Sequence, residues 1–313
     1  MIERLGRLRA QVLGLNRRNH GYLFAHNARE RYHVVDDKLV TKQTLAAHDV
    51  PTPALHAHCD AQWRVRALGA RLASIPDFVL KPARGAGGAG IVVIAGRQDG
   101  RFVKASGATL SRADLEAHAC DVVAGAYSPG GRGDVLLVEE RLVPEPGLAA
   151  LAYRGMPDLR VLVFRGVPVL AMLRLPTRRS DGRANLHLGG VGVGVDLASG
   201  RTTHAVLGRR PLEAHPDLGV RLAGVTLPAF DDAITLAARA ADAVGLGFLG
   251  VDLVVDARHG PLVLELNARP GLTIQLANRR GLRPLLDAVA RATLPETPAA
   301  RAMFGRQLSG SSR

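Results

Sequence analysis

Residues 250–272 restrict the possible folds of this chain more than any other segment, because two apolar runs lie on either side of one turn-forming segment. Residues 251–255 read Val-Asp-Leu-Val-Val, and residues 262–266 read Leu-Val-Leu-Glu-Leu. Both runs have the composition of buried strands. Between them, Arg258-His259-Gly260-Pro261 has the residue types that end strands and form turns. The segment is therefore predicted to be a β-hairpin.

The polar residues of this hairpin are predicted to share one face. If the strands fold back symmetrically about residues 258 and 259, Asp252 lies opposite Glu265, and Asn267, two residues further on, faces the same way. Two carboxylates and an amide suit Mg²⁺ bound together with the phosphates of ATP better than they suit zinc. The alternative is a solvated hairpin with scattered acids. A carboxylate within Leu-Glu-Leu argues against it, since burying one without a partner is costly.

The length and composition of the chain limit the classes of protein to which it can belong. A chain of 313 residues can bury a large core. No run of about 18 apolar residues occurs, and the N-terminus lacks the pattern of a secretion signal, which predicts a cytoplasmic protein without membrane insertion. Cys59 and Cys120 lack metal-ligand spacing and are expected to be reduced and structural. Residues 294–313 are expected to be a flexible tail.

The net charge of +13 comes mostly from arginine. Lysine occurs only at positions 38, 42, 81 and 104, so a lysine here marks a place that needs a compact ammonium group, and Lys38 and Lys81 stand out. The arginines are spread along the chain, and few aromatic residues are present to stack on bases, which disfavours nucleic-acid binding. The positive field favours an acidic small molecule or an acidic polypeptide.

A glycine loop separates two predicted strands in the first half of the chain. The first strand spans residues 77–82 and ends in Lys81-Pro82, the loop spans residues 84–90, and the second strand spans residues 91–94. A Rossmann motif or a P-loop would require a helix after the loop, so both are excluded. The loop is expected to be a flap whose backbone N–H groups approach phosphate oxygens. A plain flexible hairpin turn is the alternative.

Further elements follow from local patterns. Residues 36–49 and 231–244 have helical spacing, and Ser111 with Asp114 forms a capping box at the start of a helix. Residues 134–140, 158–164 and 167–175 read as strands. The first 35 residues are arginine-rich and are expected to form a basic arm or a packing helix.

The order of these motifs resembles the ATP-grasp ligases, and most closely their alpha-L-glutamate ligase (RimK-like) branch. The resemblance covers residues 36–292. It implies an α+β ATP-grasp fold, with two α+β lobes gripping ATP and a shortened N-terminal region before them. The expected parts are a basic arm at 1–35, a small lobe at 36–142, a large lobe at 143–293 and the tail at 294–313.

The resemblance also implies roles for individual residues. ATP phosphates would be bound by Lys38, Lys81, Arg183 and Asn185, beneath the flap that contains Gly85, Gly87 and Gly88. The adenosine part would be held by Glu139, Glu140, Leu142 and Asp158. Asp252, Glu265 and Asn267 would hold two Mg²⁺ ions, with Mn²⁺ as an alternative.

The implied reaction joins a carboxylate to an amine. The carboxylate takes the γ-phosphate of ATP, and the amine then displaces phosphate, so no protein nucleophile is needed. Arg160 and Arg174, on adjacent predicted strands, are candidates to clamp the substrate carboxylate, with outward-facing solvated arginines as the alternative. Arg269 is a candidate for orienting the acceptor, and Arg183 for reaching the acyl-phosphate.

The sequence therefore predicts an ATP- and Mg²⁺-dependent ligase that adds glutamate or another amino acid to a peptide, protein or small acceptor. An ATP-binding regulatory protein that has lost ligase activity is the main alternative, and an arginine-rich nucleic-acid binder is a further one. A homo-oligomer or an acidic protein partner remains open.

Overall fold

The computed structural model describes residues 10–85 and 87–310, which divide into two compact units. The large unit comprises Met1–Asp36, Gln43–Thr52 and Val143–Arg313, and the small unit comprises Asp37–Lys42 and Pro53–Leu142. The predicted arm, flap and tail each include positions outside the described residues, namely residues 1–9, Ala86 and residues 311–313.

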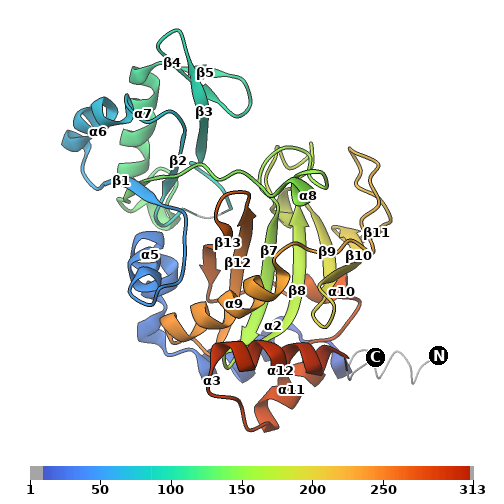
Figure 1. The fold of residues 1–313 in the computed structure, drawn as a ribbon. Helices are drawn as coiled ribbons and strands as arrows, with labels where there is room; N and C mark the ends of the chain where they lie inside the picture. Colours follow the sequence, from blue (N-terminus) through green and yellow to red (C-terminus); the bar gives the residue numbers. More distant parts are fainter. Residues whose placement is uncertain (1–9, 86, 311–313) are drawn as a thin grey trace. The chain divides into compact units, whose positions relative to one another are not determined.

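The small unit is built on an antiparallel sheet (Figure 1). In the described part of the chain this sheet has six strands in the order β1-β6-β2-β3-β4-β5. Their bounds are β1(Leu55–Cys59), β2(Phe78–Pro82), β3(Val92–Gln98), β4(Arg101–Lys104), β5(Thr109–Leu110) and β6(Leu136–Glu139). The helices α6(Val65–Leu72) and α7(Arg112–Val123) pack with it around a core that includes Leu72, Phe78 and Leu80. The predicted capping box of Ser111 and Asp114 is confirmed at the start of α7.

The large unit contains a second antiparallel sheet. Seven strands of the described chain follow the order β11-β10-β9-β8-β7-β12-β13. Their bounds are β7(Asp158–Phe164), β8(Val167–Leu175), β9(Val191–Asp196), β10(Arg201–Leu207), β11(Arg210–Leu212), β12(Phe248–Asp256) and β13(Gly260–Asn267). The helices of this unit's C-terminal half are α8(Pro146–Ala149), η5(Leu186–Leu188), α9(Phe230–Val244), α10(Ile274–Asn278), α11(Arg283–Arg291) and α12(Pro298–Gly310).

Side-chain alternation along the strands gives this sheet two apolar faces. One face, which carries Leu159 and Leu253, packs against the alanine-rich helix α9. The other face carries Leu162, Phe164 and Phe248 and packs against α10, α11 and the N-terminal segment. Apolar groups therefore cover much of both faces of this sheet.

The N-terminal segment is part of the large unit and not a separate arm. Its described residues form α2(Leu15–Arg18), η1(Asn19–Leu23), α3(Phe24–His26), η2(Arg29–Arg31) and α4(His33–Asp36). Leu13, Tyr22 and Leu23 are buried in the core beside Phe164 and Phe248. The Asn27 side chain donates to the Phe248 carbonyl at 2.8 Å and accepts from the Phe248 N–H at 2.8 Å. The sequence left open whether this stretch is a basic arm or a packing helix, and the structure shows packing helices.

The prediction of a flexible tail was wrong for residues 298–310. This stretch forms α12, which packs against β8 and α9. Gly305 lies so close to β8 that a Cβ at this position would sit 2.1 Å from the Pro168 carbonyl oxygen. A glycine inside a helix weakens the helical signal of the sequence, but here it allows close contact with the sheet.

Residues 43–52 also differ from the prediction, which placed them in the small lobe. The helix α5(Lys38–Ala46) begins in the small unit, but Leu45 and Val50 are buried in the core of the large unit. Because these two side chains are buried there, residues 43–52 belong to the large unit. In the part of the chain that is described, no helix has both the length and the apolar character needed to cross a bilayer.

Candidate active site

The pairing of β12 with β13 places Asp252 directly opposite Glu265, as predicted. A β-bulge is needed for this register. Near the turn Leu253 pairs with Val263, whereas one step further Asp252 pairs with Glu265, so Leu264 is the extra residue. Without the extra residue, Asp252 would lie opposite Leu264, and the acidic pair would be out of register.

Asp252 is the centre of a buried network of charged side chains. Both of its oxygens accept from Arg160 of β7, with Nε–Oδ1 and Nη2–Oδ2 distances of 2.6 Å. Arg174 Nη2 lies 2.7 Å from Oδ2, and Asn267 Nδ2 donates to Oδ2 at 3.1 Å. Asp252 is only 2% exposed, so these contacts compensate for the loss of water.

Asp158 completes what we call the acid–arginine cluster: Asp158, Arg160, Arg174 and Asp252. Arg174 Nε donates to Asp158 Oδ1 at 2.5 Å, across the β7–β8 pairing. Burial raises the pKa of Asp158 to about 7. Arg174 opposes this rise, and the negative charge of Asp252 adds to it. Burial would also raise the pKa of Asp252, but Arg160 and Arg174 outweigh it and lower that pKa to about 2. Asp252 therefore stays ionised at neutral pH.

The donor set of the hairpin fits a hard cation. Asp252 and Glu265 are carboxylates, and Asn267 shares their face through its contact with Asp252. Among the described residues, no three His, Cys, Asp or Glu side chains gather closely enough to hold a metal ion. A cation here would therefore depend on Asn267 and on substrate oxygens, and it would share Asp252 with two guanidinium groups.

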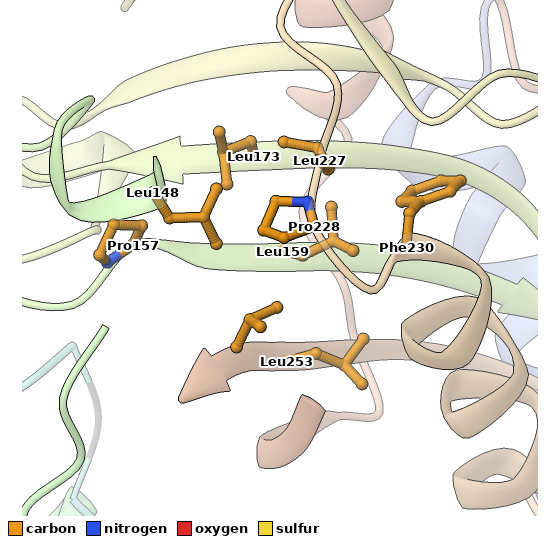
Figure 2. Close-up of a pocket in the computed structure, with 9 residues that line it drawn as sticks. Leu148, Pro157, Leu159, Leu173, Leu227, Pro228, Phe230 and Leu253 are labelled. Atoms are coloured by element: carbon orange, nitrogen blue, oxygen red, sulfur yellow. The ribbon is translucent and has the colours of Figure 1, made fainter. Parts of the chain in front are cut away.

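An apolar recess lies on the opposite face of the same strands (Figure 2). Its nine lining residues are all apolar and include Leu159, Leu173 and Leu253. Leu159 and Leu253 neighbour Arg160 and Asp252 along their strands, and alternation turns them to the other side of the sheet. The recess offers no polar group to a phosphate or a carboxylate, so it is a gap in the core beneath the charged residues.

A second candidate set lies in the small unit, where two lysines share one glutamate. Lys42 Nζ lies 2.9 Å from Glu139 Oε1, and Lys81 Nζ lies 2.6 Å from Glu139 Oε2. All three side chains are less than 10% exposed as residues. We call Lys42, Lys81 and Glu139 the lysine–glutamate cluster. In this trio cations outnumber the anion, which favours the approach of an anionic ligand.

Lys42 was missed in the sequence analysis, although a signal for it exists. It is one of only four lysines, and it lies four residues after Lys38, so the two share a face of α5. Burial lowers the pKa of Lys42 to about 8, with Glu139 opposing this shift and Lys81 adding to it. Lys42 also donates to the Pro53 carbonyl at 2.6 Å.

The glycine loop connects β2 to β3, which confirms its predicted place between two strands. Lys38 Nζ donates to the Gly85 carbonyl at 2.7 Å, at the start of the loop. Gly87 and Gly88 have positive φ angles of 64° and 81°, which favour glycine. At the end of the loop, a Cβ on Gly90 would lie 2.7 Å from the Tyr127 ring. The Gly90 carbonyl also contacts His118 Nε2 at 3.0 Å, so hydrogen bonds hold the residues at both ends of the loop.

The remaining predicted residues are distributed over both units. Glu140 donates its backbone N–H to the Ala54 carbonyl at 2.9 Å, and Leu142 is half-buried just after β6. Arg183 is exposed, and the Asn185 side chain accepts from the His187 N–H at 2.9 Å. Arg269 is exposed, stacks over Tyr32 at 4.5 Å and lies 3.3 Å from Asp36.

Direct contacts therefore unite only part of the predicted set. Asp158, Arg160, Arg174, Asp252 and Asn267 form one network, and Lys81 with Glu139 forms another. Asp158, predicted to bind the nucleoside with Glu140, lies in the large unit and is bonded to Arg174, so its nucleoside role stays a prediction.

Known structures of similar fold include a RimK domain protein of ATP-grasp type from Sphaerobacter thermophilus, with 16% identity and a TM-score of 0.44 over 84% of this chain and 70% of that one. The ATP-grasp ligase PsnB, solved with a minimal precursor, has 16% identity and a TM-score of 0.45 over 85% of this chain and 62% of its own.

Two curated proteins from strains of Xanthomonas oryzae pv. oryzae, both named probable alpha-L-glutamate ligase, are 30% identical to this chain over 239 residues. The match covers 75% of this chain and 57% of each relative, so the chain spans little more than half of their length.

The family model described as "Sugar-transfer associated ATP-grasp" matches residues 17–291. That range includes the lysine–glutamate cluster, the glycine loop, the acid–arginine cluster and the hairpin. The ATP-grasp fold predicted from the order of these motifs is confirmed. The chain belongs to the sugar-transfer associated ATP-grasp family.

Proposed function

We propose that this protein is an ATP- and Mg²⁺-dependent ligase that joins a carboxylate to an amine through an acyl-phosphate. The observation that carries the proposal is the shared face of Asp252, Glu265 and Asn267 on the β12–β13 hairpin, beside two arginines whose side chains are mostly buried. Oxygen donors of this kind suit Mg²⁺ bound together with substrate phosphates. Two ions, or Mn²⁺ in their place, are compatible with the same donors.

The small unit supports the ATP part of the proposal. Lys81 and Lys42 place two ammonium groups around one carboxylate, in surroundings that exclude water. Lys38 contacts the start of the glycine loop, whose backbone N–H groups can approach phosphate oxygens. We propose that both units serve one ATP-dependent reaction.

The chemistry balances without a protein nucleophile. A carboxylate oxygen of the donor forms a bond to the γ-phosphorus of ATP, the bond from that phosphorus to the β–γ bridging oxygen breaks, and ADP leaves. The amine nitrogen of the acceptor then attacks the acyl carbon, phosphate leaves, and the nitrogen loses a proton. Mg²⁺, when bound, neutralises charge on the phosphates.

Arg160 and Arg174 receive a revised role. They were predicted to clamp a substrate carboxylate, but their guanidinium groups bond to Asp252 and Asp158. We propose that they position Asp252 and keep it ionised, since they lower its pKa. A carboxylate that is always charged is ready to hold a cation at any physiological pH.

The identity of the substrates rests on likeness alone. The names of the curated relatives support glutamate as the amino acid, and the family description makes sugar-linked amines worth including among the acceptors. A peptide, a protein and a small amine are the other acceptor classes. The cytoplasm is the proposed location.

The experiment that tests the function combines nucleotide analysis with a screen for products. The full chain is incubated with ATP, Mg²⁺, glutamate or other amino acids, and pools of peptides, amines and amino sugars. We expect ADP and phosphate in equal amounts, together with a new amide identified by mass spectrometry. AMP and pyrophosphate as products would refute the acyl-phosphate route. Tight ATP binding with no amide formed from any pool would favour an ATP-binding regulatory protein.

A further inference from the structure

Two loops of the large unit meet beside the acid–arginine cluster. One loop precedes β7 and contains Tyr153 and Arg154, and the other follows β8 and contains Arg178. Arg154 lies four residues before Asp158, and Arg178 lies four residues after Arg174, so both loops leave the sheet at the end where Asp158 pairs with Arg174 (Figure 1). The Tyr153 N–H donates to the Pro176 carbonyl at 3.2 Å, which ties the loops together.

The tips of the loops have matching backbone geometry. Arg154-Gly155 and Asp181-Gly182 each combine two positive φ angles, 54° and 67° in the first and 51° and 72° in the second. A Cβ on Gly155 would lie 1.9 Å from the Gly182 carbonyl oxygen, so the two turns touch through their glycines. A positive φ is unfavourable for arginine, and the fold maintains it at Arg154.

The arginines of these loops are held by an aromatic ring. The Arg154 guanidinium carbon lies 5.5 Å from the centroid of the Tyr153 ring, and that of Arg178 lies 5.2 Å from it. Within the described residues neither guanidinium forms an ion pair with a carboxylate. Asp217, the acid nearest by contact, accepts from the backbone N–H of Arg178 at 2.7 Å. Both arginines are exposed, so a ligand can reach their positive charges.

The second loop is also rigid at its base. Thr177 and Ser180 are buried and bond to each other, with the Ser180 hydroxyl accepting from the Thr177 N–H at 2.9 Å. The Thr177 hydroxyl donates to the Gly189 carbonyl at 2.8 Å, and a ring nitrogen of His215 contacts the Pro176 carbonyl at 2.9 Å. A fixed base holds the backbone of Arg178 in one place, so less backbone entropy is lost when a ligand binds.

We propose that Tyr153, Arg154 and Arg178, the arginine–tyrosine patch, bind a non-reacting anionic group, a carboxylate or a phosphate, on the acceptor. This inference rests on the proposed function, because it assigns the acceptor to that reaction. Guanidinium groups recognise both anions through paired N–H donors. Because the patch lies on loops beyond the strands that carry Arg174 and Asp252, it would hold a remote part of the substrate and convert that contact into orientation.

The test measures anion binding separately from ligation. The full chain is saturated with Mg²⁺ and a non-hydrolysable ATP analogue and is then titrated with inorganic phosphate and with succinate in a calorimeter. We expect the wild type to bind at least one of them and the variant Arg154→Gln/Arg178→Gln to bind it at least tenfold more weakly. The anion that binds more tightly identifies the anionic group.

A matched control is Arg209→Gln/Arg210→Gln, which removes the same charge from the turn after β10 and from the first residue of β11. It should bind the anion like the wild type. Equal binding by the patch variant and the wild type, or no anion binding by a wild type that binds the ATP analogue, would overturn the patch alone. Failure to bind the analogue would instead overturn the proposed function. If the double variant does not fold, Arg178→Gln alone is expected to weaken binding at least threefold, and an unchanged affinity would overturn the proposal.

Discussion

The two units bury charge in opposite ways. In the small unit, two lysines surround one glutamate, whereas in the large unit two arginines meet two aspartates and the neighbouring hairpin adds Glu265. Lysines outnumber the carboxyl group in the first set, and carboxyl groups outnumber the arginines in the second. The small unit therefore has the composition of an anion site, and the large unit has that of a cation site.

The use of arginine in the large unit and of lysine in the small unit matches the difference between a cation site and an anion site. Arg160 uses two nitrogens to hold both oxygens of Asp252, which fixes the carboxylate in one orientation. Lysine has one compact ammonium group, and the two lysines of the lysine–glutamate cluster contact different oxygens of Glu139. The large unit thus orients an acid for a ligand, while the small unit concentrates positive charge.

The largest expected effect comes from removing one acid of the cation site. Glu265→Gln should lower the rate of ADP formation by about 100-fold or more, because it removes a charge that would stabilise a bound cation. Glu265 is only half-buried, so the fold should persist. Steady-state ADP release checks this, with the exposed Glu213→Gln as control. Retained turnover would show that the large unit does not use this face for Mg²⁺.

Asp252→Asn should affect stability as well as activity. The variant leaves two mostly buried guanidinium groups with one aspartate, and breaking a buried ion pair typically costs about 3–5 kcal/mol. Urea unfolding of Asp252→Asn and Glu265→Gln measures the difference between them. If both variants unfold at the same urea concentration, the acid–arginine cluster does not stabilise the large unit as described.

Lys81→Met tests the anion site. It removes one of two ammonium groups around Glu139, so we expect ATP affinity to fall by roughly 10- to 100-fold, as for the loss of one charge-assisted contact. Calorimetric titration with the non-hydrolysable ATP analogue measures this affinity. Lys104→Met, on β4, is the matched control and should bind normally. Equal affinity in both variants would remove Lys81 from the nucleotide site.

The smallest effect concerns the pH dependence of stability. Lys42 has a pKa of about 8 in the folded protein, against 10.5 without burial. Below pH 8 Lys42 carries its proton in both the folded and the unfolded protein. Above it the folded state loses its proton first, so the unfolded state binds more protons and the free energy of unfolding rises with pH, by at most about 3 kcal/mol up to pH 10.5. Chemical denaturation of the wild type and Lys42→Met at pH 7 to 10 compares the slopes. A slope that is the same in both would mean that Lys42 is not the titrating group.

Local patterns were sufficient for the hairpin but not for its bulge. Alternation and turn residues predicted that Asp252 faces Glu265, and this register is confirmed. The extra residue, Leu264, is an ordinary apolar strand residue like Leu262 and Val263, so no turn or bulge signal in the sequence distinguishes it. The capping box at Ser111 and the place of the glycine loop between strands were also predictable, because each depends on residues close together in the chain.

Elements without a strong local pattern were predicted only in part. Packing helices were one of two expectations for the N-terminal segment, and α12 was expected to be part of a flexible tail. The segment 10–36 is polar and arginine-rich, and its short helices gain their stability from burying Leu13 and Tyr22 against a sheet formed much later in the chain. For α12, Gly305 weakened the helical pattern and yet permits its contact with Pro168. In both cases the deciding contact is with residues more than 100 positions away.

The sequence by itself determined that Glu265 and Asn267 share a face, because alternation along one strand is a local property. The bulge of the folded hairpin decided that Asp252 lies opposite Glu265 on that face. Only the tertiary structure decided that Asp252 meets Arg160 and Arg174, and that Lys42 joins Lys81 at Glu139. These partners lie on strands and helices far apart in the chain. Sheet order and burial, which set the charge balance of each unit, are properties of the whole fold.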